Sequence, residues 1–169
     1  MTMFAKTGPL AVMLALAANT AFAHVTLEAP QAQIGGSYKA ALRVSHGCGG
    51  SPTIRVRVRI PEGFIGVKPM PKAGWTIETV KASPSEGVRE ISWSGGRLPS
   101  DWYDEFVFVG TPAADLTPGV ALYFPVIQDC ETGVEHWEEI PTGGEAHGVK
   151  SPAPSLELTP AAQTHHHHH

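Results

Sequence analysis

The stretch TIRVRVRI, from Thr53 to Ile60, decides the fold because its residues alternate strictly between two chemical types. Its three arginines fall on one face, and Ile54, Val56, Val58 and Ile60 fall on the other. A period of two residues is typical of a strand with one solvated face and one buried face. The stretch therefore predicts a strand that ends at Pro61-Glu62-Gly63 and turns its apolar face toward a core.

Shorter signals of the same kind recur along the chain, and no segment carries a sustained apolar period of 3.6 residues. Further strands are predicted at 24–29, 37–44, 64–68, 74–81, 87–93, 103–110, 119–127 and 133–140. Clusters of Gly, Pro, Ser and Asp separate them, which is the pattern of an all-β antiparallel sandwich. We place a single domain at 24–143 and expect 144–169, which is rich in Pro and Ala, to be a flexible tail.

Composition agrees with this fold class and excludes several functions. Of 169 residues, 18 are Gly and 15 are Pro, while 42% are hydrophobic. The net charge of −4 argues against nucleic acid as a partner. There is no phosphate-binding loop, CxxC pair or recognisable Ser-His-carboxylate motif, so nucleotide-dependent, thiol-exchange and hydrolytic functions have no support.

Residues 1–23 have the layout of a secretory signal peptide. Lys6 precedes an apolar run over 10–18, and the small-x-small sequence Ala21-Phe22-Ala23 marks a cleavage site. The run is about half of the roughly 20 residues that a membrane-spanning helix needs, and no later segment is longer. We expect an exported, periplasmic protein without a membrane span, whose mature chain begins at His24.

Cleavage in front of His24 would create a specific chemical group. The new α-amine and the imidazole Nδ1 of the same residue can bind one metal ion in a six-membered chelate ring. A metal can displace the protons of both donors near neutral pH, because their reference pKa values are near 8 and 6.5. Paired nitrogen donors favour Cu(II) among the divalent first-row ions. A copper site at His24 is the resulting prediction.

Cys48 and Cys130 are the only cysteines. In an exported protein a disulfide between them is the leading interpretation, and it would join positions 82 residues apart. The alternative is a thiolate copper site with Cys48 beside His46.

Two other positions have unusual surroundings. Glu105 shares its predicted strand face with Val107 and Val109, so its carboxylate needs a partner, either an arginine or lysine or a metal at His24. Trp137 alternates with His136 in the segment 133–140 and is interpreted as a core aromatic residue.

Several motifs together resemble the YcnI-like copper-binding proteins. They are HVTLEAP after the signal, SHGCGGSPT, IPEGF, KPMPKAGW, ISWSGG, the DEF of 104–106, YFPVIQDCETG and Trp137. The resemblance implies an immunoglobulin- or cupredoxin-like sandwich. It also implies a mono-histidine brace for Cu(II), formed by His24 and Glu105 with Trp137 close to the metal. Asp104 and Glu135 are acidic residues of the same chemical type as Glu105 and lie near Glu105 and Trp137 in the sequence. The implied role is copper acquisition, delivery or homeostasis, in company with other periplasmic copper carriers and without catalysis.

The remaining histidines and two other functions stay open at this stage. His46 is expected to support the turn at the disulfide, and His136 to lie on the surface or between strands. His147 and the run 165–169, either native or a purification tag, could bind metal loosely. A copper-dependent oxidase or monooxygenase-like enzyme would need a second histidine and an open coordination position. A β-sandwich interaction module would bind no metal tightly.

Overall fold

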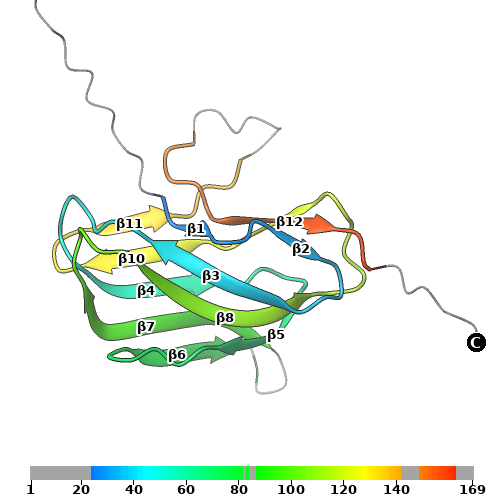
Figure 1. The fold of residues 1–169 in the computed structure, drawn as a ribbon, viewed down its shortest axis with the longest axis horizontal. Coiled ribbons are helices and arrows are strands. Elements are labelled where there is room, and N and C mark those ends of the chain that lie inside the picture. The colour runs from blue at the N-terminus through cyan, green and yellow to red at the C-terminus, as the bar shows by residue number, and fades with distance from the viewer. Residues whose placement is uncertain (1–23, 82, 84–86, 142–148, 163–169) are drawn as a thin grey trace, which may run out of the picture.

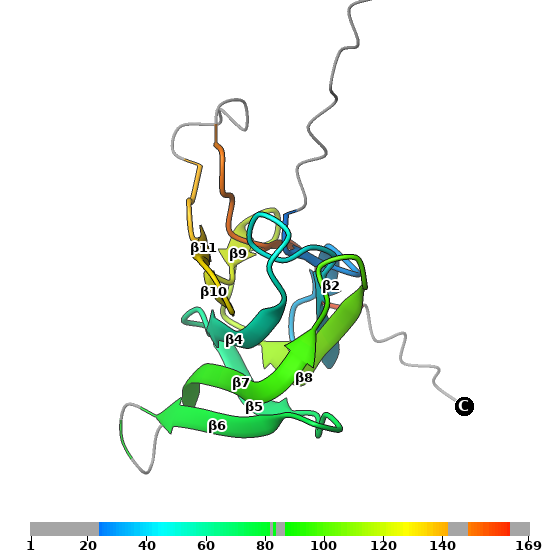
Figure 2. The same cartoon turned by 90° about the vertical axis from the view of Figure 1, so that its left-hand side faces the viewer.

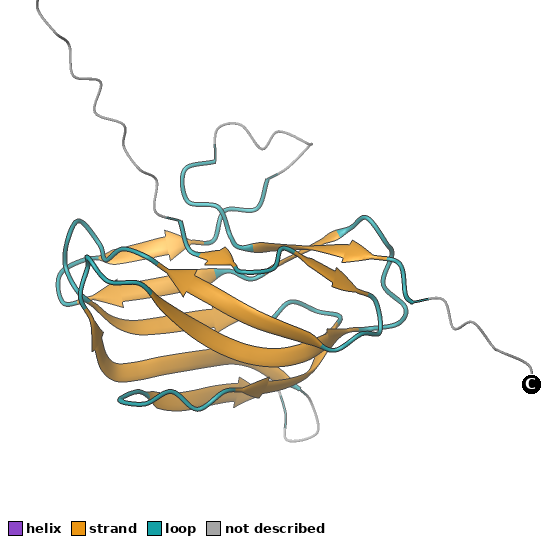
Figure 3. Ribbon diagram, in the orientation of Figure 1, coloured by secondary structure: helices purple, strands orange, loops and turns teal. Residues whose placement is uncertain are grey.

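A computed structural model describes residues 24–81, 83, 87–141 and 149–162. These residues form strands and loops without a helix, as Figure 3 shows, so they include no helix that could cross a membrane. Two large sheets face each other across a common core, and a smaller sheet flanks them (Figures 1 and 2). The predicted all-β sandwich is confirmed.

Twelve strands are present in the described residues, in three sheets. The first sheet has the order β1 (Thr26–Leu27), β3 (Tyr38–Val44), β8 (Asp104–Pro112), β5 (Phe64–Pro69). The second has the order β11 (Val134–Trp137), β10 (Val126–Cys130), β4 (Thr53–Arg59), β7 (Val88–Leu98), β6 (Thr76–Lys81). The third has the order β2 (Gln31–Gln33), β12 (Ser155–Thr159), β9 (Ala121–Tyr123). Neighbours are antiparallel except β2 and β12, which are parallel.

Large aromatic side chains fill the space between the two main sheets. Trp93, Phe106, Phe108 and Phe124 are fully buried, and edge-to-face contacts link Trp93 to Phe106 at 5.6 Å between ring centres. Val56 and Val58 of β4 are also fully buried, as the alternation of that strand predicts. Burial of these side chains from both sheets provides the main driving force for the sandwich.

Ile54 departs from the predicted alternation. It is 37% exposed, whereas Thr53 is fully buried, and the pairing of β4 with β7 shifts register between Thr53 and Arg55. A bulge of this kind places two successive residues outside the regular alternation. Ile54 therefore faces outward, and the prediction that it lies in the core is wrong.

Strand β8 is buried on its core face and only partly covered on its outer face. Phe106 and Phe108 face the core, and Val107 on the opposite face is 4% exposed. Val109, however, is 40% exposed, because it lies on the outer face of the first sheet opposite Lys39 and Lys68. The outer face is thus covered at Val107 and open at Val109.

One predicted strand is shortened and another is divided. The segment 24–29 gives only β1, and the chain enters the third sheet at β2. The segment 119–127 gives β9 and β10 in different sheets, with Pro125 between them. Proline has no N–H to donate to a strand ladder, which explains a break at this point.

The expected tail at 144–169 contains a strand. Leu156 and Leu158 of β12 are buried in the core, and β12 is the central strand of the third sheet. The prediction that the domain ends at 143 and that everything beyond is a flexible tail is therefore wrong, because the alternating leucines of Ser155–Thr159 complete the hydrophobic core. His147 and the run 165–169 lie outside the described residues.

The disulfide between Cys48 and Cys130 is present, with its Cα atoms 6.0 Å apart. It joins the loop between β3 and β4 to the end of β10. Both cysteines are used, so the alternative of a thiolate copper site is excluded in this state of the protein.

Candidate metal centre

His24 lies immediately before β1 and contacts Trp137 at the end of β11. The two ring centres are 5.5 Å apart, and the rings meet edge to face at 68°. β1 and β11 are edge strands of the two different large sheets, so the contact joins those sheets at one side of the sandwich. Trp137 is 9% exposed and packs with the core, as its alternation predicts, while it also lies next to the expected first residue of the mature chain.

Gln128 of β10 holds the Trp137 side chain through a hydrogen bond. The indole Nε1–H donates to Gln128 Oε1 at 3.0 Å. Gln128 Nε2 donates to the His46 carbonyl oxygen at 2.6 Å and to Thr53 Oγ1 at 2.7 Å. We call the set Trp137, Gln128, Thr53 and the His46 carbonyl the buried cluster. It connects the strand that carries Trp137 to β4 and to the loop that carries the disulfide.

The sequence interpretation missed Gln128, although a signal was present. In Val126–Cys130 the alternation places Gln128 on the same face as Val126 and Cys130, both of which are buried. An amide on a buried strand face requires hydrogen-bond partners. His46 was expected to support the turn at the disulfide, and its backbone carbonyl does bond to this amide.

A small hollow opens beside His24. It has a volume of about 220 Å³ and lies between β1 and the segment Pro152–Ser155 that leads into β12. Leu27 and Pro30 complete its apolar wall. The segment once expected to be a tail thus forms part of the surroundings of His24.

Glu105 lies elsewhere on the first sheet. It pairs with Arg43, which in turn pairs with Thr26 of β1, so Glu105 is two strands from β1, roughly 10 Å at the usual strand spacing. Because Phe106 faces the core, Glu105 faces outward, whereas Trp137 points inward. The structure brings His24 and Trp137 together and gives Glu105 other partners.

Those partners form an exposed network. The Tyr103 hydroxyl donates a hydrogen bond to the Glu105 carboxylate, and the Arg43 guanidinium lies 5.6 Å from the centre of the Tyr103 ring. Arg43 also forms an ion pair with Glu28 at 3.1 Å. We call Glu28, Arg43, Tyr103 and Glu105 the outer-face network. The hydrogen bond to Glu105, more than burial, raises the pKa of Tyr103 above its ordinary value, because a phenolate could not donate it.

The other acidic residues near the site are occupied differently. Asp104 pairs with Lys72 at 2.6 Å. Glu135 is partly buried on β11, two residues before Trp137, and therefore lies on the same strand face as that residue. His136 is exposed and contacts Glu138 at 2.8 Å, and this contact, together with Arg59, lowers the pKa of Glu138.

Side chains alone do not complete a metal site within the described residues. No group of three or more His, Cys, Asp and Glu side chains there is arranged to hold a metal ion. In the 169-residue chain the nitrogen of His24 is a peptide nitrogen, bonded to Ala23. Peptide cleavage would convert it to an amine and add the missing donor, so the chemistry of His24 fits copper only at a free N-terminus.

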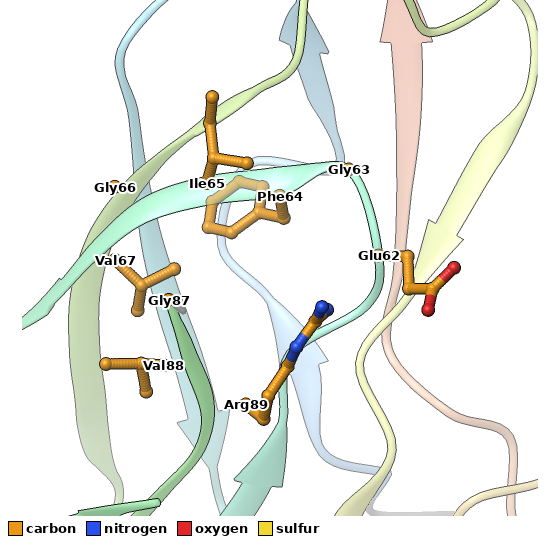
Figure 4. A pocket seen from close by; sticks show the side chains of 9 residues that line it. All are labelled: Glu62, Gly63, Phe64, Ile65, Gly66, Val67, Gly87, Val88 and Arg89. Carbon is orange, nitrogen blue, oxygen red and sulfur yellow. The ribbon is translucent and has the colours of Figure 1, made fainter. Parts of the chain in front are cut away.

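A larger pocket lies away from all the predicted site residues. Figure 4 shows it between β5 and the beginning of β7, with Phe64, Val67 and Val88 in its wall and the charged residues Glu62 and Arg89 beside it. Its volume is about 440 Å³. None of His24, Glu105 and Trp137 lines it, so it is separate from the candidate metal centre.

A family model described as a domain of unknown function, DUF1775, matches residues 24–158. The chain belongs to the DUF1775 family. The match begins at His24 and ends within β12, so the DUF1775 domain includes the strand that the sequence interpretation assigned to a tail. No curated protein matches the chain in sequence.

One solved structure shows the same fold. The DUF1775 domain is similar to a crystal structure of an uncharacterized protein from Nocardia farcinica with an immunoglobulin-like fold, at 25% identity and a TM-score of 0.66. That similarity covers 80% of this chain and 98% of the other. A cohesin module of a family 33 glycoside hydrolase from Clostridium perfringens is 13% identical with a TM-score of 0.48, covering 81% and 96% of the two chains. The immunoglobulin-like fold is confirmed.

Proposed function

We propose that this DUF1775 protein is an exported, periplasmic copper-binding protein that holds Cu(II) at the N-terminus of its mature chain. The observation that carries the proposal is the contact between His24, the first residue after the predicted cleavage site, and the Trp137 indole at 5.5 Å. The resemblance to the YcnI-like proteins and the start of the family match at His24 support it.

The donors follow from the chemistry of His24. Its α-amine and Nδ1 supply two nitrogen ligands, and a carboxylate supplies a third. The Trp137 ring lies against the imidazole and limits the access of water on that side. Such a site holds copper for acquisition or delivery, with other periplasmic copper carriers as donors or recipients, and needs no catalytic step.

Copper titration of the mature chain tests this proposal. The protein is residues 24–164, which retains β12 and removes the five terminal histidines that could bind copper themselves. We expect one tight equivalent of Cu(II). The matched control carries an acetyl group on the α-amine of His24, which leaves every side chain in place but removes the amine as a donor, and it should lose the tight site. Tight binding that survives acetylation of the amine would exclude the brace.

The identity of the carboxylate needs its own comparison. The resemblance selects Glu105, whereas Glu135 shares a strand face with Trp137. Glu105→Gln and Glu135→Gln each remove one charge with little change in size, and the EPR spectrum of bound Cu(II) should change in the variant that loses the ligand. We expect the change in Glu105→Gln, which requires Glu105 both to leave Tyr103 and to approach His24 when copper binds. An altered spectrum in Glu135→Gln alone would assign the ligand to β11.

Release of copper can be driven by reduction. Nitrogen and carboxylate donors suit Cu(II) better than the softer Cu(I), so the affinity should fall when the ion is reduced. Competition titrations with Cu(I) and Cu(II) chelators measure both affinities. Equal affinities would remove reduction as the release step, and oxygen consumption above that of free copper would favour the monooxygenase-like enzyme instead.

A further inference from the structure

The Gln128 side chain is an unusual component of the core. It is 1% exposed, and burial of an amide is costly unless its donors and acceptor are paired. The three hydrogen bonds to Trp137, His46 and Thr53 pair them. The DUF1775 domain therefore keeps a neutral polar group between its sheets where a leucine would pack without this requirement.

The orientation of this amide is fixed by the chemistry of its partners. The His46 carbonyl oxygen can only accept a hydrogen bond, and the Trp137 indole N–H can only donate one. The amide nitrogen must therefore face His46, and the amide oxygen must face Trp137. If the amide were rotated by a half-turn, its oxygen would face the His46 carbonyl oxygen and its nitrogen would face the Trp137 N–H. Neither pair could form a hydrogen bond.

The anchor points of Gln128 belong to well-held parts of the fold. Thr53 is fully buried at the start of β4, and His46 lies two residues before Cys48 of the disulfide. Trp137 lies on β11, an edge strand whose backbone pairs with β10 on one side only. The hydrogen bond from Trp137 to Gln128 thus links a side chain on an edge strand to the interior of the sandwich.

We propose that Gln128 is a positioning residue of the copper centre. It sets the orientation in which the Trp137 indole meets His24 and does not itself bind the metal. This role rests on the proposed function of His24 as a copper ligand. Because a partner outside the ligand shell controls the geometry within it, loss of such a partner typically weakens metal binding by about 10-fold to 100-fold.

A double-mutant cycle on the mature chain, residues 24–164, tests the role. Gln128→Leu removes the three side-chain hydrogen bonds of this residue at nearly constant size and adds no metal ligand. Trp137→Phe keeps an aromatic ring against His24 and removes the indole N–H. We expect Gln128→Leu to weaken Cu(II) binding about tenfold and to change the EPR spectrum, with a similar change in Trp137→Phe.

The combination of the two substitutions decides how Gln128 acts. If it acts through the indole N–H, the double variant should bind copper no more weakly than Trp137→Phe alone. A further tenfold loss on adding Gln128→Leu to Trp137→Phe would overturn the proposal, since the effect would then not pass through Trp137. If Gln128→Leu does not fold, Trp137→Phe still decides, because a wild-type EPR spectrum in that variant overturns the proposal.

A measurement without metal separates this proposal from the proposed function. Hydrogen exchange of the Trp137 indole N–H, followed by NMR in the metal-free mature chain, should be slow in the wild type and faster in Gln128→Leu. Fast exchange in the wild type would overturn the positioning role while leaving copper binding intact. Slow exchange together with no tight copper site in the wild type would instead reject the proposed function, and with it the role of Gln128.

Discussion

The buried cluster around Gln128 and the outer-face network around Glu105 are both held by polar contacts, but they differ in burial and charge. Gln128 is 1% exposed and its partners are neutral. Arg43 and Glu28 are 47% and 55% exposed, and Tyr103 is 52% exposed. Water competes for the contacts of the network, whereas the hydrogen bonds of Gln128 to Trp137 and Thr53 are buried.

This difference separates the fixed part of the site from the adjustable part. Exposed ion pairs contribute about 0–1 kcal/mol, so a change of partners in the network costs little. A buried group that loses its partner costs about 1–3 kcal/mol, so the buried cluster resists rearrangement. His24 and Trp137 therefore lie beside a preorganised region, while Glu105 belongs to a region that can exchange Tyr103 for another partner.

The largest effect on the free energy of unfolding should come from removing β12, whose leucines belong to the hydrophobic core. A chain that ends after Lys150 loses Leu156 and Leu158 from the core. Loss of two buried leucines should by itself lower the free energy of unfolding by about 4–10 kcal/mol, and the pairing of β12 with β2 and β9 is lost as well. Urea denaturation measures this, with the chain that ends after Thr164 as the control. Equal midpoints for the two chains would mean that β12 is not part of the cooperative domain.

Removing the disulfide should have the next largest effect. Replacing both Cys48 and Cys130 by serine opens a link across 82 residues, and the chain-entropy argument gives a loss of about 4.5 kcal/mol. Denaturation of this variant and of the oxidised wild type provides the comparison. A loss below about 1 kcal/mol would indicate a compact unfolded chain rather than an expanded one.

The Tyr103 titration tests whether the network is adjustable. Glu105→Gln should lower the pKa of Tyr103 toward its ordinary value, since the carboxylate hydrogen bond is the main cause of its elevation. Tyrosinate absorbance against pH measures the change, and Tyr103→Phe identifies the relevant step. Because the pKa is raised on folding, this contribution to stability is complete below the unfolded pKa near 10 and is lost as the pH rises through the folded pKa.

The same titration of Tyr103 with copper bound tests whether Glu105 is a ligand of the metal. If Glu105 leaves Tyr103 to bind Cu(II), the metal-loaded mature chain should show the lower pKa of the Glu105→Gln variant. A Tyr103 pKa that stays raised with copper bound would mean that Glu105 keeps its hydrogen bond and is not the ligand. Tyr38 does not obscure the result, because burial raises its pKa to about 12.

The smallest effect is expected for Arg43→Gln in the outer-face network. It removes the ion pair with Glu28 and the contact with the Tyr103 ring, both of which are solvent-exposed. The free energy of unfolding should change by no more than about 0.5 kcal/mol. A loss above about 2 kcal/mol in urea denaturation would place the network among the fixed parts of the molecule and reverse the comparison.

Much of the fold could be predicted because the relevant signals are local. Alternation located β3, β4 and β8, and the prediction of export favoured the disulfide between Cys48 and Cys130. Glu105 was correctly placed on the face shared with Val107 and Val109. Such inferences need only the two-residue period of a strand and the chemistry of the residue itself.

Other features depend on pairings between distant parts of the chain. Ile54 faces outward because of a register shift against β7, and β12 is stabilised by β2, more than 100 residues earlier. The alternating leucines of β12 were visible in the sequence, but their segment is only five residues long and stands apart from the other strands. Gln128 and Trp137 could not be joined without the pairing of β10 with β11.

The sequence by itself determined a β-sandwich with one disulfide, and it predicts export with a histidine at the mature N-terminus, because strand period, cleavage-site pattern and chelate chemistry are properties of neighbouring residues. Only the tertiary structure decided that His24 meets Trp137, that the Trp137 indole donates a hydrogen bond to Gln128, and that Glu105 lies two strands from β1 with Tyr103. The physical reason is that sheet register and strand order, which are set by burial of the whole core, determine which side chains meet.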